Sequence, residues 1–130
     1  MRDSEHRLPA DLDAPAKGRR LVEAWAAEHD RLHALVLAVS ELVTNAVVHG
    51  APATELTIRF GSTGSMIRVV VAHLGSVFEP RLERGYSGLS IVDRIVDRWG
   101  IEERDDSVEV WFEVDDVPAD TDVQTLATGL

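Results

Sequence analysis

Apolar residues recur along this chain with two different periods, and each period predicts a set of elements. Where they recur every three to four positions, helices are expected, over residues 14–28, 31–49 and 88–99. Where they alternate or form short continuous runs, strands are expected, over residues 56–60, 66–72, 101–104 and 108–114. A further short edge strand is expected at residues 7–9.

Capping and breaking residues set the expected ends of the helices. Asp13 is expected to cap the first helix, in which Pro15 is tolerated because it lies in the first turn. Gly50, followed by Pro52, is expected to end the second helix, and Gly100 to end the third. Residues 76–87 have no period and are expected to form a loop.

The elements follow one another as helix, helix, strand, strand, helix, strand, strand, without the alternation of a doubly wound fold. This order predicts an α/β fold, a two-layer sandwich in which helices cover one face of a mixed, mostly antiparallel sheet. One domain is expected over residues 1–114, because a chain of 130 residues is long enough for a single core. Residues 115–130 are acidic and aperiodic, and a flexible tail is expected there.

Composition narrows the classes of function. No apolar run approaches the roughly 18 residues of a membrane helix, and the first residues lack the apolar segment of a signal peptide, so a cytoplasmic protein is expected. The chain has no cysteine, which excludes disulfides, thiolate metal sites and cysteine nucleophiles. Its net charge of −10 and its scattered arginines argue against direct binding of nucleic acid.

The second expected helix carries one polar line on an otherwise apolar surface. Glu41, Asn45 and His49 lie four residues apart and therefore share a face of that helix. By periodicity alone this stripe is the narrow solvated face of a core helix. The alternative is a site, because a carboxylate and a carboxamide one turn apart can serve as a base and a metal ligand.

Three segments carry a resemblance to a known family. Residues 41–50, Glu-Leu-Val-Thr-Asn-Ala-Val-Val-His-Gly, resemble its asparagine box in both residues and position. Residues 88–100 resemble its second glycine box with the following helix, and residues 73–75 end a strand where the first glycine box belongs. By these motifs the chain resembles the ATP-binding domain shared by histidine kinases, gyrase-type ATPases and anti-sigma-factor serine kinases. The resemblance is closest to the stand-alone bacterial anti-sigma-factor serine kinases.

The resemblance implies a site for ATP and Mg²⁺. Asn45 matches the asparagine that coordinates the magnesium ion, which prefers oxygen ligands. Glu41 matches the presumed base that accepts a proton from the attacking hydroxyl group. The residues implied to contact the nucleotide are Asn45, His49, His73, Gly75, Gly85, Gly88 and Leu89. His49 also has a simpler explanation, as a residue at a helix C-terminus that interacts favourably with the dipole.

The nucleotide side departs from the family pattern. His73 stands where the family has an aspartate that accepts a hydrogen bond from the adenine amino group, and Val77 stands where it has a glycine. A neutral imidazole offers one acceptor and no negative charge. Losing such a contact costs about 1–3 kcal/mol, a tenfold to hundredfold loss in affinity. Tyr86 and Ser87, ahead of Gly88, also occupy places where small or basic residues are common.

Two functions follow from the resemblance. The first is a regulatory protein that binds a sigma factor or an anti-anti-sigma partner of the STAS type, phosphorylates a serine of that partner with ATP, and forms a homodimer. The second is a nucleotide-free protein-binding module of the same fold. A third alternative is a detached kinase module with another protein substrate.

Overall fold

The computed structural model describes residues 2–49, 54–74, 87–104 and 106–116. These residues form three helices and five strands. In chain order the elements are β1 (Arg2–Pro9), α1 (Ala14–Trp25), α2 (Leu32–His49), β2 (Glu55–Ser62), β3 (Met66–Leu74), α3 (Ser87–Ile95), β4 (Arg98–Arg104) and β5 (Ser107–Asp115). No helix in this part of the chain is long and apolar enough to cross a membrane.

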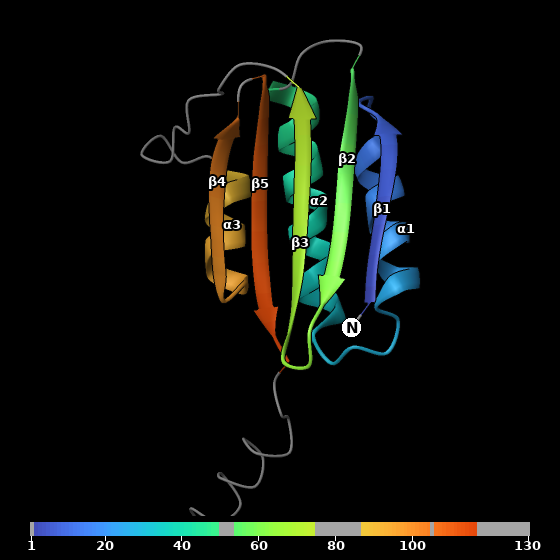
Figure 1. Cartoon of the computed structure of the whole chain (residues 1–130), viewed down its shortest axis with the longest axis vertical. Helices are drawn as coiled ribbons and strands as arrows, with labels where there is room; N and C mark the ends of the chain where they lie inside the picture. The colour runs from blue at the N-terminus through green and yellow to red at the C-terminus, as the bar shows by residue number, and fades with distance from the viewer. Residues whose placement is uncertain (1, 50–53, 75–86, 105, 117–130) are drawn as a thin grey trace, which may run out of the picture.

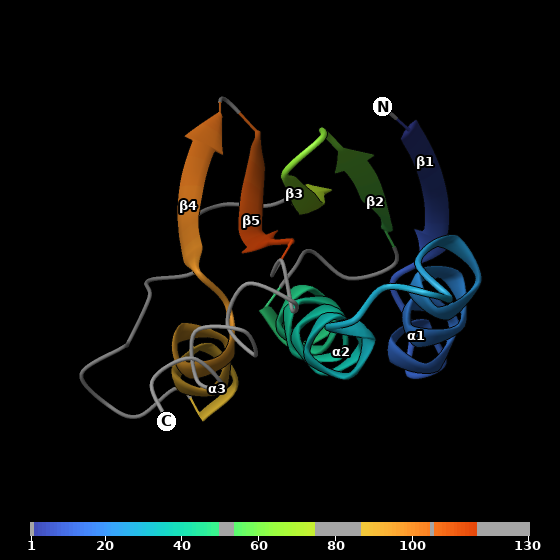
Figure 2. The same cartoon turned by 90° about the horizontal axis from the view of Figure 1, so that it is seen from below.

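The strands form one sheet in the order β1-β2-β3-β5-β4, and each of its four pairings is antiparallel. The three helices lie together on one face of this sheet and leave the other face open (Figure 2). The predicted fold class, a two-layer α/β sandwich, is confirmed.

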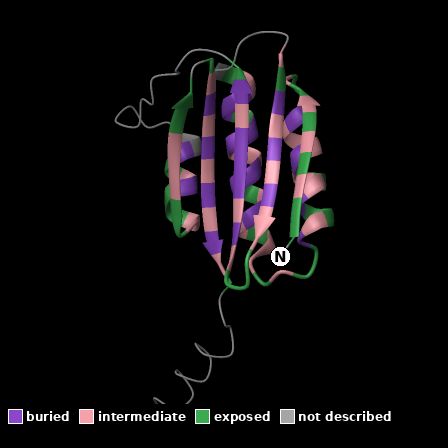
Figure 3. Cartoon of the chain, viewed as in Figure 1, coloured by how far each residue is buried: buried purple, intermediate pink, exposed green. Residues whose placement is uncertain are grey.

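The core lies between the sheet and the helices, and strand alternation supplies half of it (Figure 3). In β5, for example, Val108, Val110, Phe112 and Val114 are buried while the residues between them are half-buried on the open face. The central helix α2 supplies the largest helical share of the core, with Leu35, Ala38, Val39, Leu42, Val43 and Ala46. Burial of these apolar side chains is the dominant stabilising term.

Close packing of α1 against α2 depends on Gly18. A Cβ atom at this position would lie 3.2 Å from a methyl group of Val43 and 3.3 Å from one of Val39. The missing side chain therefore lets α1 approach the side of α2 that faces away from α3, so that α2 lies between the two other helices (Figure 2).

Several predicted boundaries differ from the structure. The edge strand β1 covers eight residues rather than three, because its backbone pairs with β2 along the whole length. Helix α3 ends at Ile95, so Gly100 does not terminate it. Trp99 and Gly100 belong to β4, where Trp99 pairs with Phe112. Pairing with β5 thus overrides the helical period of residues 95–99.

Two further differences concern the chain's connections. Asp13 precedes α1 but makes no side-chain capping bond; instead its own amide donates to the Asp11 carboxylate at 2.9 Å. Strand β5 continues to Asp115, one residue past the expected end of the domain, and the amide of Asp116 donates to the carbonyl of Ser65. The expected loop at 76–86 and the expected tail at 117–130 lie outside the described residues.

Candidate functional site

The predicted site residues Glu41 and Asn45 lie on the side of α2 that faces α3. Helix α2 contacts both α1 and α3. Its α1 side is marked by Ser40, whose hydroxyl group accepts a hydrogen bond from Arg19 at 2.9 Å. Glu41 and Asn45 are rotated away from Ser40 by about 100° and 140° around the helix axis, given 3.6 residues per turn. Glu41 is half-buried and Asn45 is buried.

Helix α3 runs antiparallel to α2, so the first turn of α3 lies at about the same height along α2 as Glu41. The residue that precedes α2, Arg31, pairs with Asp97, which lies just after the end of α3. Nine residues of α3 rise about 13 Å, and nine residues of α2 counted from its start reach the neighbourhood of Glu41. Figure 1 agrees, since α3 lies beside the lower part of α2. The free amides at the N-terminus of α3 therefore lie near the polar stripe of Glu41 and Asn45.

Asn45 carries the clearest sign of a ligand site. It is only 8% exposed, and within the described residues its side-chain nitrogen has no hydrogen-bond partner. A buried polar group without a partner costs about 1–3 kcal/mol, so native proteins retain few of them. A carboxamide offers an acceptor oxygen and two N–H donors, which suit a metal ion and a phosphate oxygen respectively. Its chemistry therefore fits the magnesium and phosphate groups that the family implies.

His73 lies near the end of β3 and is 3% exposed. Its Nδ1 atom lies 3.1 Å from the carbonyl oxygen of Leu74, which can only accept, so Nδ1 is protonated and donates this hydrogen bond. The end of β3 and the end of α2 lie at the same end of the molecule (Figure 1).

The remaining predicted site residues divide into three groups. Gly88 and Leu89 belong to the first turn of α3, and the Leu89 side chain is fully buried in the core. Only the backbone of Leu89 is therefore available to a ligand. His49 is the last residue of α2. Gly75 and Gly85 lie outside the described residues.

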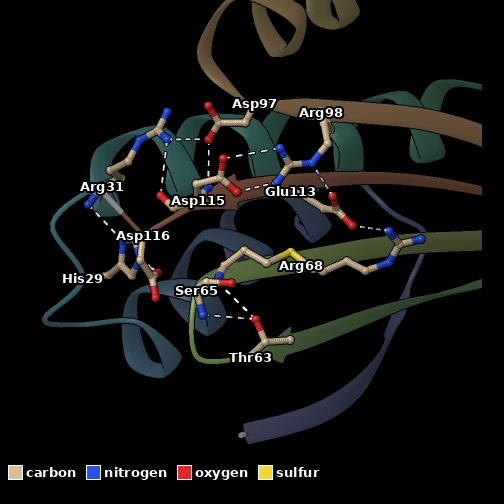
Figure 4. A network of polar contacts seen from close by, with 11 residues as sticks. His29, Arg31, Thr63, Ser65, Arg68, Asp97, Arg98, Glu113, Asp115 and Asp116 are labelled. Atoms are coloured by element: carbon tan, nitrogen blue, oxygen red, sulfur yellow. Dashed lines mark hydrogen bonds and ion pairs between the residues drawn. The ribbon is translucent and has the colours of Figure 1, made fainter. Parts of the chain in front are cut away.

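A network of charged groups below the site was not foreseen from the sequence (Figure 4). Arg31 pairs with Asp97 at 2.6 Å, and Arg98 pairs with Glu113 at 2.6 Å and with Asp115. No sequence pattern connects these residues, because the first two are 66 positions apart. The network joins the residues just before α2 and just after α3 to the start of β4 and the end of β5.

These contacts lower two carboxyl pKa values. Burial alone would raise the pKa of Asp97, but the amide of Asp115 and the guanidinium of Arg31 outweigh it and hold the pKa below its usual value. Hydrogen bonding from Arg98 lowers the pKa of Glu113 despite partial burial, with a further contribution from Arg68. Both carboxylates therefore remain charged well into the acidic range.

The open face of the sheet contains a groove of about 640 Å³, but none of the predicted site residues lines it. Two of its arginines are held in ion pairs: Arg59 pairs with Glu109 at 3.1 Å, and Arg68 pairs with Glu113, which lies outside the groove's lining, at 2.7 Å. The Arg68 guanidinium also stacks 4.3 Å from the ring centre of Trp111, which covers this half-buried side chain. Cross-strand pairs of this kind solvate an open sheet face, so this groove carries no sign of chemistry.

Comparison with known proteins places the chain in a family. The model of the histidine kinase-like ATPase domain matches residues 8–114, so the chain belongs to this family. The matched span includes all the described helices and the polar stripe on α2. The resemblance stated from the sequence is thereby confirmed at the level of the family. Curated proteins include no significant match.

Solved structures support the same fold. The RsbU and RsbW domains of Rv1364c from Mycobacterium tuberculosis align with a TM-score of 0.67 and 21% identity, over 88% of this chain and 32% of that one. The nucleotide-free catalytic domain of the histidine kinase ThkA aligns with a TM-score of 0.59 and 17% identity, over 89% of this chain and 97% of that one. The chain therefore spans about a third of the first protein and nearly all of the second. At these identities the likeness shows the fold.

Proposed function

We propose that this protein is an ATP-binding regulatory protein of the anti-sigma-factor serine kinase type. In this proposal it binds a sigma factor or an anti-anti-sigma protein of the STAS type in the cytoplasm, acts as a homodimer, and phosphorylates a serine of the latter partner. Membership in the histidine kinase-like ATPase family supports nucleotide binding. The asparagine box of residues 41–50 and the similarity to a structure containing an RsbW domain support the narrower type.

The observation that carries the proposal is the buried amide of Asn45, whose nitrogen has no hydrogen-bond partner within residues 2–49, 54–74, 87–104 and 106–116. It lies one helical turn after Glu41, on the side of α2 toward which the first turn of α3 points. In this assignment Asn45 holds Mg²⁺ through its amide oxygen and the backbone of Gly88 and Leu89 faces the phosphates. His49, His73, Gly75 and Gly85 complete the nucleotide contacts.

Glu41 is assigned the role of base in the transfer. The serine oxygen of the partner would attack the γ-phosphorus, its proton would pass to the Glu41 carboxylate, and the bond to the β–γ bridging oxygen would break, releasing ADP. When bound, Mg²⁺ supplies neutralisation of the phosphate charge. A rigid helix suits this arrangement, because it keeps Glu41 and Asn45 at a constant separation of one turn.

Calorimetric titration with ATP, with and without Mg²⁺, tests nucleotide binding. Binding that requires Mg²⁺ and is abolished in Asn45→Ala is expected, whereas Thr44→Ala should bind like the wild type. Thr44 is a suitable control because it is the neighbouring residue on α2 and its side chain is exposed. The absence of binding at millimolar ATP would refute a kinase role.

His73 favours a second candidate, a nucleotide-free protein-binding module. In the proposed match of motifs His73 takes the place of the family's adenine-contacting aspartate; its imidazole is buried and lacks the charge of a carboxylate. A pull-down from cell lysate, with this protein as the bait, distinguishes the two candidates. Recovery of a sigma factor or a STAS-type protein, without ATP binding, would identify the protein-binding module. Recovery of neither partner would refute a role in sigma-factor regulation for both candidates.

A further inference from the structure

Apolar contacts alone do not fix the position of α3. Leu89 and Val92 are fully buried beneath this nine-residue helix. The hydrophobic effect that holds them is non-directional, so a short helix can tilt or slide with little change in buried area. Polar contacts with defined geometry therefore contribute to fixing the place of α3 relative to α2.

Arg31 supplies those contacts at the C-terminal end of α3. One guanidinium nitrogen donates to the carbonyl of Ile95, the last residue of the helix, at 3.0 Å. The other donates to the Asp97 carboxylate at 2.6 Å, and the same carboxylate oxygen accepts the amide of Asp115 at 2.8 Å. A cation at a helix C-terminus is favourable for both the free carbonyls and the dipole. Figure 4 shows Arg31, Asp97 and Asp115 converging from three parts of the chain.

The neighbouring Arg98 provides a natural contrast. It makes ion pairs with Glu113 and Asp115 but has no hydrogen bond to α3 among the described residues. Its side chain is 48% exposed, whereas that of Arg31 is 23% exposed. Screening by solvent makes exposed pairs weak and flexible. Of the two arginines, only Arg31 is placed to hold α3 in position.

We propose that Arg31 is a positioning residue for the site on α2, acting through α3. It fixes the C-terminal end of α3 beside the start of α2, and the rigid helix carries that constraint to its first turn near Glu41 and Asn45. Because α3 is about 13 Å long, a tilt of about 10° at the Arg31 end displaces the other end by about 2 Å. Displacements of that size are large compared with the tolerance of a preorganised site.

Two measurements test this proposal, one of which does not need nucleotide. The chain has no cysteine, so Thr44→Cys and Ser90→Cys give one exposed spin-label site on each of α2 and α3. Electron-spin distance measurements should give a single narrow distribution in the otherwise unaltered chain. Arg31→Met should broaden or shift this distribution, and the matched variant Arg98→Met should leave it unchanged. An unchanged distribution in Arg31→Met would overturn the proposal.

The second measurement rests on the proposed function and uses MgATP. Arg31→Met should bind MgATP about fivefold more weakly, equivalent to about 1 kcal/mol, while Arg98→Met stays within about twofold of the wild type. Equal losses of affinity in both variants would overturn the positioning role. If the wild type binds no ATP, the proposed function fails and the spin-label distances alone decide the role of Arg31.

Folding is checked in parallel by urea denaturation. Should Arg31→Met fail to fold, Arg31→Lys replaces it in both measurements, because lysine keeps the charge but cannot donate along two directions from a planar group. A broadened distance distribution in folded Arg31→Lys supports the proposal, and a distribution like that of the wild type refutes it.

Discussion

Replacing Asn45 with leucine should stabilise the protein and abolish nucleotide binding at the proposed site. Leucine has nearly the shape of asparagine, so the substitution removes the polar groups without leaving a cavity. Asn45 is 8% exposed, and its amide nitrogen is without a partner in the described part of the chain. A native residue that destabilises its own fold is expected where function requires it.

The magnitude has two parts. Removing an unpaired buried donor recovers about 1–3 kcal/mol. Leucine also has a higher helix propensity than asparagine, which adds about 0.5 kcal/mol in the interior of α2. The free energy of unfolding of Asn45→Leu should therefore exceed that of the wild type by roughly 1.5–3.5 kcal/mol in the absence of ligand.

Urea denaturation followed by circular dichroism measures this difference, and Thr44→Leu is its matched control. Thr44 is exposed on the same helix, so Thr44→Leu gains helix propensity without removing a buried polar group. It should raise the free energy of unfolding by only about 0.5 kcal/mol. MgATP should raise the melting temperature of Thr44→Leu but not that of Asn45→Leu.

The reasoning would be refuted if Asn45→Leu were less stable than the wild type without ligand. That result would mean that the amide nitrogen is satisfied in the folded protein. An increase no larger than that of Thr44→Leu would refute it as well, because helix propensity alone would then explain the change.

Three other predictions concern the packing of Gly100, the pH dependence of stability, and the proposed adenine contact of His73. Gly100→Ala should lower the free energy of unfolding, measured in urea, by about 1–3 kcal/mol, because the new Cβ would lie 2.7 Å from the Trp111 ring. Gly64→Ala should have little effect, since apart from its chain neighbours no described residue has an atom within 4 Å of a Cβ placed there. On acidification, Glu113→Gln should lose less stability than the wild type. In the wild type the lowered pKa of Glu113 stabilises the folded state at any pH above the pKa of this carboxyl in the unfolded chain. This contribution disappears as the pH falls through the pKa of the folded state. His73→Asp should tighten ATP binding in calorimetry by about tenfold or more, because a carboxylate is the stronger acceptor.

Each of these has a clear contrary outcome. Equal stability of the two glycine variants would show that Trp111 moves aside at no cost. A constant difference between Glu113→Gln and the wild type across the acidic range would contradict the pKa argument. Unchanged or weaker ATP binding by His73→Asp would show that His73 does not occupy the base-contacting position.

Local patterns predicted the layers of this fold well. The alternation in residues 108–114 corresponds to the buried and half-buried faces of β5, and the apolar surface of residues 31–49 to the central helix α2. Both patterns reflect which side of a helix or strand is removed from water. The spacing of apolar residues within that element is enough to show this side. The asparagine box could also be recognised from the sequence, because Glu41 and Asn45 lie one turn apart on one helix.

The ends of helices and strands that depend on partners distant in the chain could not be predicted from local sequence. Residues 95–99 continue a helical period, yet the amide of Asp97 bonds to the carbonyl of Glu113 and Trp99 joins β4. The length of β1 likewise follows from its pairing with β2, since its own sequence is polar. Hydrogen bonds between strands are set by the partner strand, which a local pattern does not contain.

The sequence by itself thus determined the two layers, the central helix and the polar stripe of Glu41 and Asn45, because each depends on residues within a few turns of one another. Only the tertiary structure decided that the buried Asn45 amide has no partner among the described residues, that α3 runs antiparallel to α2, and that Arg31 holds its end. These properties depend on which distant segments surround a side chain. Whether a side chain is buried or paired depends on the atoms around it, and these come from distant segments that meet only in the fully packed structure.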